Sequence, residues 1–462
     1  MVNRLVVAAP ASGSGKTTVA TGLMAALRRT GDRVAPFKVG PDYIDPGYHG
    51  LATGRPGRNL DPVMVGEHRV ASLFAHGARG CDLAVVEGVM GLFDGRVDTE
   101  GIGSTAHVAK LLSAPVLFVV DARGQSRSLA ALLHGFRGYD PTVRLGGVVL
   151  NQVGSARHEH VLRGACAEVG LEVLGVLPRD EKFRLPSRHL GLVTAAEHGQ
   201  PALDAVDAIA AAVAEHVDLA AVRRLAAQVP ARALPTWDPA AEVDPVPGAP
   251  VVAVAGGAAF TFGYAEHTEL LRAAGADVVV LDPLRDRDLP DGTAGLVLPG
   301  GFPEQHAAEL SANDGLRAAV AAFARSGGPV HAECGGLLYL ARELDGVPMC
   351  GVVDAVGSMT PRLTLGYRDA VAPVDSVLAS AGTRITGHEF HRTTLSVSSG
   401  TSGGARPAWQ WRGHDQRPVA EGFVLDGVHA SYLHTHPASA PEAVARFVRA
   451  CATESVRYEA TR

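Results

Sequence analysis

Residues 4–20, RLVVAAPASGSGKTTVA, join a short apolar run to a glycine-rich loop and then to the start of a helical pattern. The loop follows the pattern G-x-x-x-x-G-K-[ST], with Pro10 in place of the first glycine. In such a strand–loop–helix context, backbone N–H groups turn toward phosphate oxygens and the helix N-terminus adds a favourable dipole. We therefore predict a phosphate-binding loop rather than an ordinary glycine-rich turn. Its residues are Gly13, Ser14, Gly15, Lys16, Thr17 and Thr18.

The alternation of strand-like and helix-like segments continues through the first half of the chain. Further apolar runs cover residues 33–40, 81–89, 114–122, 144–153 and 171–178, and helical patterns cover 16–29, 104–112, 126–137, 157–169 and 203–228. Short β-branched runs separated by helices predict a buried parallel sheet with helices on both faces. The fold class is therefore α/β.

Six prolines between residues 229 and 250 predict an interdomain linker without a helix or a central strand. The α/β pattern then restarts, with apolar runs at 251–257, 276–284, 294–301 and 328–334. We expect a nucleotide-binding domain over 1–228, a linker over 229–250 and a second α/β domain over 251–455.

Composition excludes several classes of partner. The net charge is −6 and Lys/Arg blocks are absent, which argues against nucleic acid. No apolar run reaches the roughly 18 residues of a membrane span. The five cysteines are odd in number and scattered, which argues against a disulfide framework or zinc ribbon and favours a cytoplasmic location. They are Cys81, Cys166, Cys334, Cys350 and Cys451.

Four acidic residues follow the expected ends of two strands in the first half: Asp42, Asp45, Glu87 and Asp94. Ligands of open α/β sheets bind beyond the carboxyl ends of the strands, and Mg²⁺ prefers hard oxygen ligands. We therefore expect these acids and the Thr17 hydroxyl near a metal-bound phosphate, although capping of helices by Asp45 and Asp94 is an alternative. Asn151 ends another run and is a candidate for the adenine edge or a solvent-facing turn residue.

Residues 331–340, HAECGGLLYL, place Cys334 between an apolar run and two glycines. A sharp strand-to-helix turn of this kind exposes a nucleophile. We expect an amphipathic helix after the cysteine, whose N-terminus lowers the pKa of the thiol. Backbone donors for an oxyanion hole are expected at Gly300 and Gly301, which end a strand, and at Gly335.

A thiolate of this kind needs a base, and three histidines lie about 100 residues downstream: His429, His434 and His436. Metal binding by these histidines is the alternative, but no matching carboxylate is evident. The GHEFHRT stretch at 387–393 lacks the H-E-x-x-H spacing of a zinc site.

Seven blocks, in order along residues 3–440, resemble the cobyrinic/hydrogenobyrinic acid a,c-diamide synthases of cobalamin biosynthesis. They are APASGSGKTT, FKVGPDYIDPGYH, VVEGVMGLFDG, LPGGFPE, AECGGLLYL, GHEFH and ASYLHTHP. The resemblance implies a P-loop domain like dethiobiotin synthetase and a class I glutamine amidotransferase domain. It also implies ATP, L-glutamine and the carboxylates of a corrinoid ring as ligands, with Mg²⁺.

Carried over to this chain, the resemblance makes Cys334 the glutaminase nucleophile and His434 its base. Thr17, Asp42 and Glu87 match positions expected near Mg²⁺. The positions expected near the tetrapyrrole are Tyr43, Asp45 and Asp94, while the nearby Arg55, Arg58 and Arg96 are either substrate anchors or surface residues. Many class I enzymes have His-x-Glu, whereas the residue two after His434 is His436, so the third triad member is unassigned.

The implied reaction is the amidation of the a and c acetates through acyl phosphates, with ammonia supplied by glutamine hydrolysis. The Ala/Gly/Arg-rich composition favours metal-free hydrogenobyrinic acid over the cobalt-containing ring. Cobyric acid synthase, a Ni-sirohydrochlorin a,c-diamide synthase and a partitioning-type P-loop ATPase are the alternatives. The fold group suggests a homodimer.

Overall fold

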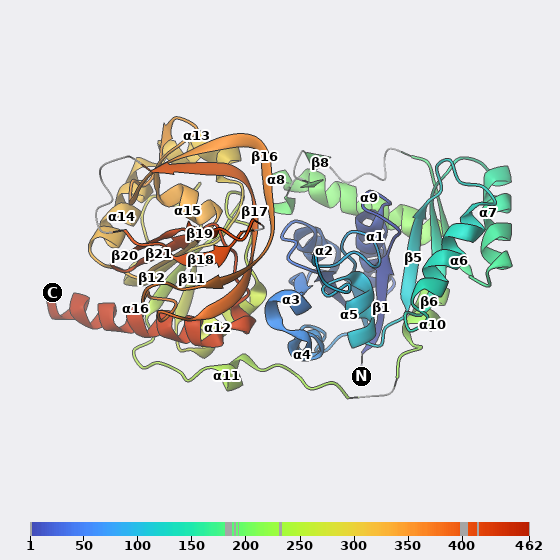
Figure 1. The fold of residues 1–462 in the computed structure, drawn as a ribbon, viewed down its shortest axis with the longest axis horizontal. Helices are drawn as coiled ribbons and strands as arrows, with labels where there is room; N and C mark the ends of the chain where they lie inside the picture. The colour runs from blue at the N-terminus through green and yellow to red at the C-terminus, as the bar shows by residue number, and fades with distance from the viewer. Residues whose placement is uncertain are drawn as a thin grey trace. The chain divides into compact units, whose positions relative to one another are not determined.

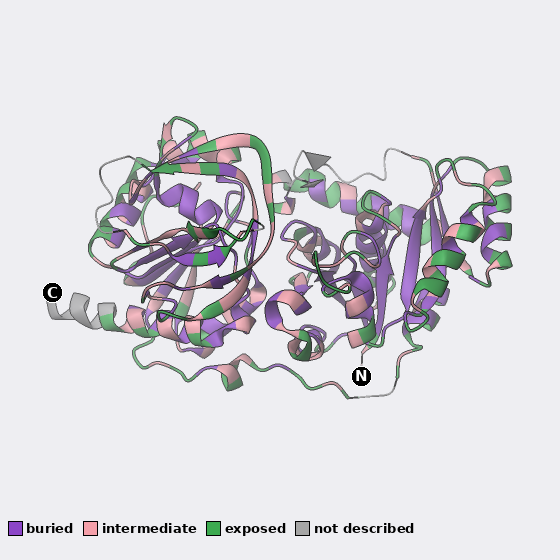
Figure 2. Cartoon of the chain, viewed as in Figure 1, coloured by how far each residue is buried: buried purple, intermediate pink, exposed green. Residues whose placement is uncertain are grey.

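The computed structural model describes residues 2–461 apart from 181–186, 189–190, 193, 231–232, 398–404 and 414. The chain divides into two compact units, Met1–Trp237 and Asp238–Arg462, and each is built on its own central sheet (Figure 1). The strands of both central sheets are largely buried (Figure 2). Within the described part of the chain, no helix combines the length and apolarity needed to cross a membrane.

The first unit has a seven-stranded sheet in the order β3-β2-β4-β1-β5-β6-β7, and all neighbouring strands are parallel. The strands are β1 (Asn3–Ala8), β2 (Val34–Val39), β3 (Arg58–Leu60), β4 (Leu83–Glu87), β5 (Val116–Asp121), β6 (Leu145–Val153) and β7 (Val173–Pro178). Almost every residue of β1, β2 and β4 is buried, as expected for a parallel sheet covered by helices. The predicted parallel α/β sheet is confirmed.

Helices connect these strands, and α1 (Lys16–Arg29) follows β1 directly after the glycine-rich loop. It packs against α9 (Gln200–His216), where a Cβ on Gly22 would lie 2.6 Å from Val213, so only glycine fits. The other helices are α2 (Asp45–Thr53), α3 (Pro62–Val65), α4 (Glu67–Gly77), α5 (Thr105–Leu111), α6 (Leu129–Tyr139), α7 (Ala156–Glu168), α8 (Ala195–His198) and α10 (Leu219–Ala226). A small hairpin joins β8 (Ser187–Arg188) to β9 (Gly191–Leu192).

The second unit has a six-stranded sheet in the order β11-β10-β12-β13-β21-β20, in which only β20 is antiparallel to its neighbour. The strands are β10 (Val251–Ala255), β11 (Asp277–Leu281), β12 (Thr293–Leu298), β13 (Val330–Glu333), β20 (Phe423–Leu425) and β21 (Val428–Ser431). Its helices are α11 (Pro239–Glu242), α12 (Ala265–Ala273), α13 (Ala307–Ala312), α14 (Asp314–Arg325), α15 (Gly335–Leu340) and α16 (Pro441–Thr461), with two 3₁₀ turns, η2 (Pro303–His306) and η3 (Pro437–Ser439). The predicted α/β pattern of this half is confirmed.

A second sheet of this unit was not predicted from the sequence. Its main feature is the antiparallel pair β16 (Val353–Val371) and β17 (Arg384–Val397). The smaller strands are β14 (Ala341–Leu344), β15 (Val347–Pro348), β18 (Trp409–Arg412) and β19 (Pro418–Glu421). Much of β16 is half-buried or exposed, so the strand lacks the continuous apolar run that marks the parallel strands.

Two local predictions were wrong. The helix after Cys334 is not amphipathic: α15 has six residues, all of them buried, and the chain then continues as β14. The proline-rich segment does contain one helical turn, α11, because Pro239 occupies its first position and the Asp238 side chain accepts a hydrogen bond from Ala240 N.

Candidate active sites

The predicted phosphate loop connects β1 to α1 and has the backbone that such a loop requires. Gly15 adopts φ 94° and places Lys16 at the first position of the helix. The Lys16 ammonium lies back across the loop, donating to Met90 O at 2.5 Å and Ala11 O at 3.4 Å. Burial lowers the pKa of Lys16 to about 8, and the Lys38 ammonium adds to the fall. A polyphosphate in the loop would favour the charged form of Lys16.

The other loop residues are placed as the motif demands. Gly13 has φ 79°, and the Ser14 hydroxyl donates to Ala11 O at 2.9 Å. Thr17 and Thr18 lie in the first turn of α1. Hydrogen bonds from the Ser14 and Lys16 side chains to Ala11 O thus hold the turn.

Asn151 contacts this loop from the carboxyl-terminal part of β6. Its side-chain amide donates to Ser14 O at 3.1 Å and is buried. A Cβ on Gly15 would lie only 2.2 Å from Asn151 Nδ2, so the two residues are tightly fitted. This contact supports the loop, and the predicted adenine contact stays a prediction.

Lys38, on β2, is the residue of this site that sequence reasoning missed. Its Nζ lies 2.5 Å from an oxygen of Asp45, 3.0 Å from Glu87 and 3.7 Å from Asp42. Its side chain is almost fully buried. A lysine inside the otherwise apolar run RVAPFKV was the signal that could have found it, because an unpaired buried ammonium is too costly to keep.

Three of the four predicted acids, Asp42, Asp45 and Glu87, therefore converge around an ammonium. Glu87 accepts from the Thr17 hydroxyl at 2.6 Å, and its other oxygen lies 2.6 Å from His49 Nε2. Burial acts to raise the pKa of Glu87, but the Lys38 charge and the His49 contact outweigh it and hold that pKa below its usual value. Burial and the charges of Asp42 and Glu87 raise the pKa of Asp45 well above its usual value, so Asp45 is the acid that takes up a proton most readily.

The acids and Thr17 fit a magnesium ion only together with a phosphate ligand. The part of the chain that the structure describes holds no group of three or more His, Cys, Asp or Glu side chains arranged for a metal. Thr17 Oγ1 nevertheless lies within 3.3 Å of carboxylate oxygens of both Asp45 and Glu87. Mg²⁺ is commonly held by one or two carboxylates, water and substrate phosphates, which matches this partial set of oxygens.

Two further predicted positions lie in the loops beyond these strands. Tyr43 lies in the segment that connects β2 to α2, and its side chain is buried. Asp94 is exposed, and its carboxylate accepts from Gly91 N at 2.8 Å, so it closes the turn after β4. Asp94 thus closes a turn rather than capping a helix, which was the predicted alternative. Arg55 donates to Arg79 O at 3.1 Å on the surface.

In the second unit, Cys334 occupies the strained turn between β13 and α15. Its backbone has φ 47° and ψ −99°, a conformation that non-glycine residues rarely adopt. Its Sγ lies 3.7 Å from Phe390 O. The backbone comes very close to its neighbours here, because a Cβ on Gly336 would lie 2.0 Å from Leu298 O. The predicted elbow between a strand and a helix is thus present.

The expectation of a lowered thiol pKa was wrong for this structure. Burial raises the pKa of Cys334 well above its usual value, and the Glu304 carboxylate adds to the rise. The backbone N–H of Gly335 opposes the shift without overcoming it. A six-residue buried helix supplies too little dipole to offset removal of the thiolate from water. The resting thiol is therefore protonated and needs a base.

Three glycines surround the elbow as predicted. A Cβ on Gly335 would lie 2.9 Å from Gly301 N, so the turn after Cys334 packs on the backbone that ends β12. A Cβ on Gly300 would lie 2.3 Å from His434 Cε1. Gly300, Gly301 and Gly335 thus form one close-packed strip of backbone between Cys334 and His434. Their role as oxyanion donors stays a prediction.

Of the three candidate histidines, only His434 belongs to this strip. Its main chain pairs with His388, two residues from the carbonyl that contacts Cys334 Sγ. His429 contacts Ser376 Oγ at 3.0 Å instead, and burial lowers its pKa to about 3. His436 accepts from Ala438 N at the start of η3. His434 itself is fully buried.

Glu333, which directly precedes Cys334, was missed by sequence reasoning. Its Oε2 lies 3.7 Å from His434 Nδ1. Its Oε1 accepts from the Thr435 backbone N at 3.1 Å and from the Thr435 hydroxyl at 2.8 Å, and lies 3.3 Å from His331 Nε2. The carboxylate is therefore held among groups that carry or share protons, next to the nucleophile.

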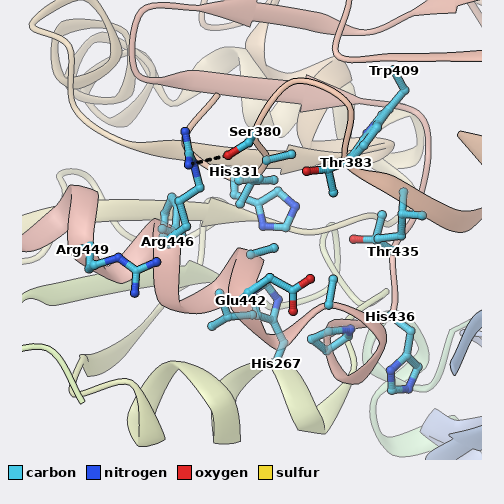
Figure 3. A pocket seen from close by; sticks show the side chains of 18 residues that line it. His267, His331, Ser380, Thr383, Trp409, Thr435, His436, Glu442, Arg446 and Arg449 are labelled. Carbon is cyan, nitrogen blue, oxygen red and sulfur yellow. Dashed lines mark hydrogen bonds between the residues drawn. The ribbon is translucent and has the colours of Figure 1, made fainter. Parts of the chain in front are cut away.

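A cavity of about 230 Å³ adjoins this group (Figure 3). His331 and Thr435, two partners of Glu333, both line it, and His436 lies on its wall. Arg446, at the opposite side of the view, donates to Ser380 Oγ at 3.0 Å. The groups that surround Glu333 thus lie between this cavity and the nucleophile elbow.

Comparison with protein families matches each unit to a different domain. Residues 5–193 match the CobQ/CobB/MinD/ParA nucleotide binding domain. Residues 251–441 match the CobB/CobQ-like glutamine amidotransferase domain. The first match covers the phosphate loop and its acids, and the second covers Cys334, Glu333 and His434.

Relatives match the chain over nearly its whole length. The chain is 60% identical to a hydrogenobyrinate a,c-diamide synthase of Mycobacterium tuberculosis over 461 residues, which covers 99% of each chain. It is 59% identical to the protein of the same name from Streptomyces coelicolor over 482 residues, covering 98% of each. A cobyrinate a,c-diamide synthase of a Synechococcus strain is 40% identical over 454 residues, covering 97% of this chain and 98% of that protein.

The Lys38 cluster yields a prediction about stability. Lys38→Met keeps the length of the side chain but leaves Asp42, Asp45 and Glu87 without their shared cation. Breaking a buried ion pair in this way costs about 3 kcal/mol or more of the free energy of unfolding. Urea denaturation followed by circular dichroism measures the change.

Lys110→Met is the matched control, because Lys110 pairs with Asp140 at 2.9 Å on the surface. Its loss should cost less than about 1 kcal/mol. Equal stabilities of the two variants would contradict the buried cluster.

Proposed function

The chain belongs to the family of hydrogenobyrinate and cobyrinate a,c-diamide synthases, and from that premise we propose that it amidates the a and c acetate carboxylates of hydrogenobyrinic acid. It is a glutamine amidotransferase ligase of cobalamin biosynthesis with a nucleotide-binding domain. The observation that carries the proposal is the pairing, in one chain, of a closed phosphate loop with a cysteine at a strained elbow.

The choice of ring and of reaction rests on the relatives. Five full-length relatives at 53–60% identity carry the name hydrogenobyrinate a,c-diamide synthase, whereas three named cobyrinate a,c-diamide synthase are 40–44% identical. This difference favours the metal-free ring. The names that all of these relatives carry also argue against cobyric acid synthase and the nickel enzyme. A partitioning-type ATPase would leave Cys334 and the second unit without a role.

In the first unit, a substrate carboxylate attacks the γ-phosphorus of ATP and displaces ADP. Ammonia then attacks the acyl phosphate and displaces inorganic phosphate, which gives the amide. Charge on the transferring phosphoryl group is stabilised by Lys16, whose ammonium lies at the loop. We propose Mg²⁺ as the metal, held by Thr17 with Glu87, Asp42 or Asp45; when bound, it would neutralise phosphate charge. Lys38 adds a second ammonium beside the acids.

In the second unit, the Cys334 thiol passes its proton to His434 and its sulfur attacks the side-chain amide carbon of glutamine. The carbonyl oxygen, negative in the tetrahedral intermediate, faces backbone amides at Gly300, Gly301 and Gly335. Collapse of the intermediate releases ammonia and leaves a thioester, which water hydrolyses to glutamate. The raised pKa of the resting thiol supports a mechanism in which a base removes the thiol proton.

Several finer points belong to the proposal. Tyr43, Asp45 and Asp94 are proposed to lie near the ring, and Asn151 near adenine. The domain limits 1–228, 229–250 and 251–455, a homodimer, a cytoplasmic location and the lack of nucleic-acid and membrane partners stay predictions.

The substrate is tested by comparing two rings. Purified protein with ATP, Mg²⁺ and glutamine should convert hydrogenobyrinic acid to its a,c-diamide with a kcat/KM at least about tenfold above that for cobyrinic acid, equal to about 1.4 kcal/mol of discrimination. Mass spectrometry counts the amides formed. Equal or reversed preference would overturn the choice of ring, and no amidation of either would overturn the function.

Two variants separate the half-reactions. Cys334→Ala should abolish glutamine-dependent amidation but retain amidation with added ammonium chloride, because ammonia then bypasses the thiol. Lys16→Ala should abolish both, because the acyl phosphate no longer forms. Loss of both activities in Cys334→Ala, or their retention in Lys16→Ala, contradicts the assigned roles.

Gly300→Ala tests the close-packed strip. The new Cβ would collide with the His434 ring and displace it, and a shift of about 1 Å in a reacting group typically costs about 100-fold in rate. Glutamine hydrolysis should fall by that factor while ammonia-dependent amidation persists. Gly263→Ala is the control, because a Cβ there meets no atom within 4 Å and should leave both rates unchanged.

A further inference from the structure

We propose that Glu333 is the residue that orients His434 and stabilises its imidazolium, and so completes the Cys334–His434 pair from the strand side. This inference rests on the proposed glutaminase reaction. In the wider amidotransferase pattern the orienting carboxylate follows the histidine by two residues, and here that position holds His436. A carboxylate from a different element therefore takes the role.

The fold brings Glu333 to His434 by strand register. Strand β13 runs parallel to β21, and Glu333 lies opposite Ser431, three residues before His434. The chain leaves β21 across the end of β13, so the residue that ends β13 faces the segment that carries the base. Glu333 Oε2 then lies 3.7 Å from His434 Nδ1. The other ring nitrogen, Nε2, is left to take the proton of the thiol.

The carboxylate is fixed and charged, as an orienting group must be. Its second oxygen accepts from the backbone N and the hydroxyl of Thr435, the residue after the base. Burial acts to raise the pKa of Glu333, but contacts with His331 and His434 outweigh it and hold that pKa well below its usual value. Glu333 therefore stays ionised when His434 becomes an imidazolium, and the attraction stabilises that state.

Three buried groups of this region, His388, His267 and Glu389, keep the same charge between pH 6 and 9. His388, on β17, faces His434, and burial lowers its pKa to about 3. His267 has a pKa lowered to about 4 by burial and by His331. Glu389 is paired with Arg368 at 2.6 Å and its pKa is lowered. Glu304 faces Cys334 rather than the base.

Glu421 offers a matched control. It is a second buried glutamate beside the same segment, with oxygens 2.6 Å from Ser431 Oγ and 2.7 Å from Tyr432 N. Burial raises its pKa to about 7, so much of it is neutral and resembles glutamine in shape and charge. Glu421→Gln thus removes a titrating carboxyl near the base without removing the contact to His434.

The test compares Glu333→Gln, Glu333→Asp and Glu421→Gln in the full chain. Glu333→Gln should lower kcat for glutamine hydrolysis about 10- to 100-fold with little change in KM, because the carboxylate acts on the proton transfer and not on substrate binding. The limb of the pH–rate profile that reports His434 should move to lower pH, since the imidazolium has lost its stabilising charge. Glu333→Asp should recover part of the rate.

Amidation driven by ammonium chloride distinguishes loss of His434 orientation from misfolding of the variant. It should remain at the wild-type rate in Glu333→Gln, and Glu421→Gln should match the wild type in kcat and pH profile. A Glu333→Gln profile that matches Glu421→Gln overturns the proposal, as does a parallel loss of ammonia-dependent amidation. If wild-type protein does not hydrolyse glutamine, or Cys334→Ala still does, the proposed function fails instead.

Discussion

Everything in the second unit that can react depends on one constraint, the close approach of two backbone turns at the carboxyl ends of neighbouring parallel strands. The turn after β12 and the turn after β13 touch where Gly301 meets Gly335, at a distance that no side chain could occupy. This contact holds Cys334 at a positive φ that a free chain would leave. The strained conformation of Cys334 persists because the glycines on both turns allow the surrounding backbone to pack closely around it.

In the first unit, charge rather than close backbone packing holds the functional groups together. Its strands also end at one edge, but the groups gathered there are three acids, and their repulsion would be severe without a cation. Lys38 supplies that cation from within β2 while Lys16 lies at the loop. The acids are thus kept close together beside the phosphate loop.

Sequence patterns predicted the residues that a local motif marks. They missed the residues whose contacts come from segments that only strand pairing brings together. Lys16 and Cys334 were found because glycines and an adjoining strand mark them along the chain. The β16–β17 pair was missed because its half-exposed residues show no continuous apolar run. Lys38 was visible as a charge inside an apolar run, but its three partners come from separate segments. The pKa of Cys334 was misjudged because a helix N-terminus is readable in sequence, whereas burial is not.

Glu333 is the sharpest case of information that register alone carries. The sequence pattern places an orienting carboxylate two residues after His434, and in this chain that position holds His436. Parallel pairing of β13 with β21 makes a residue 101 positions upstream a closer candidate. It also ties the nucleophile and the orienting group to adjacent positions of one strand end. Any movement of the elbow then shifts both together, so covalent geometry limits the spacing between Glu333 and Cys334, whereas the pairing of β13 with β21 sets their distance from His434.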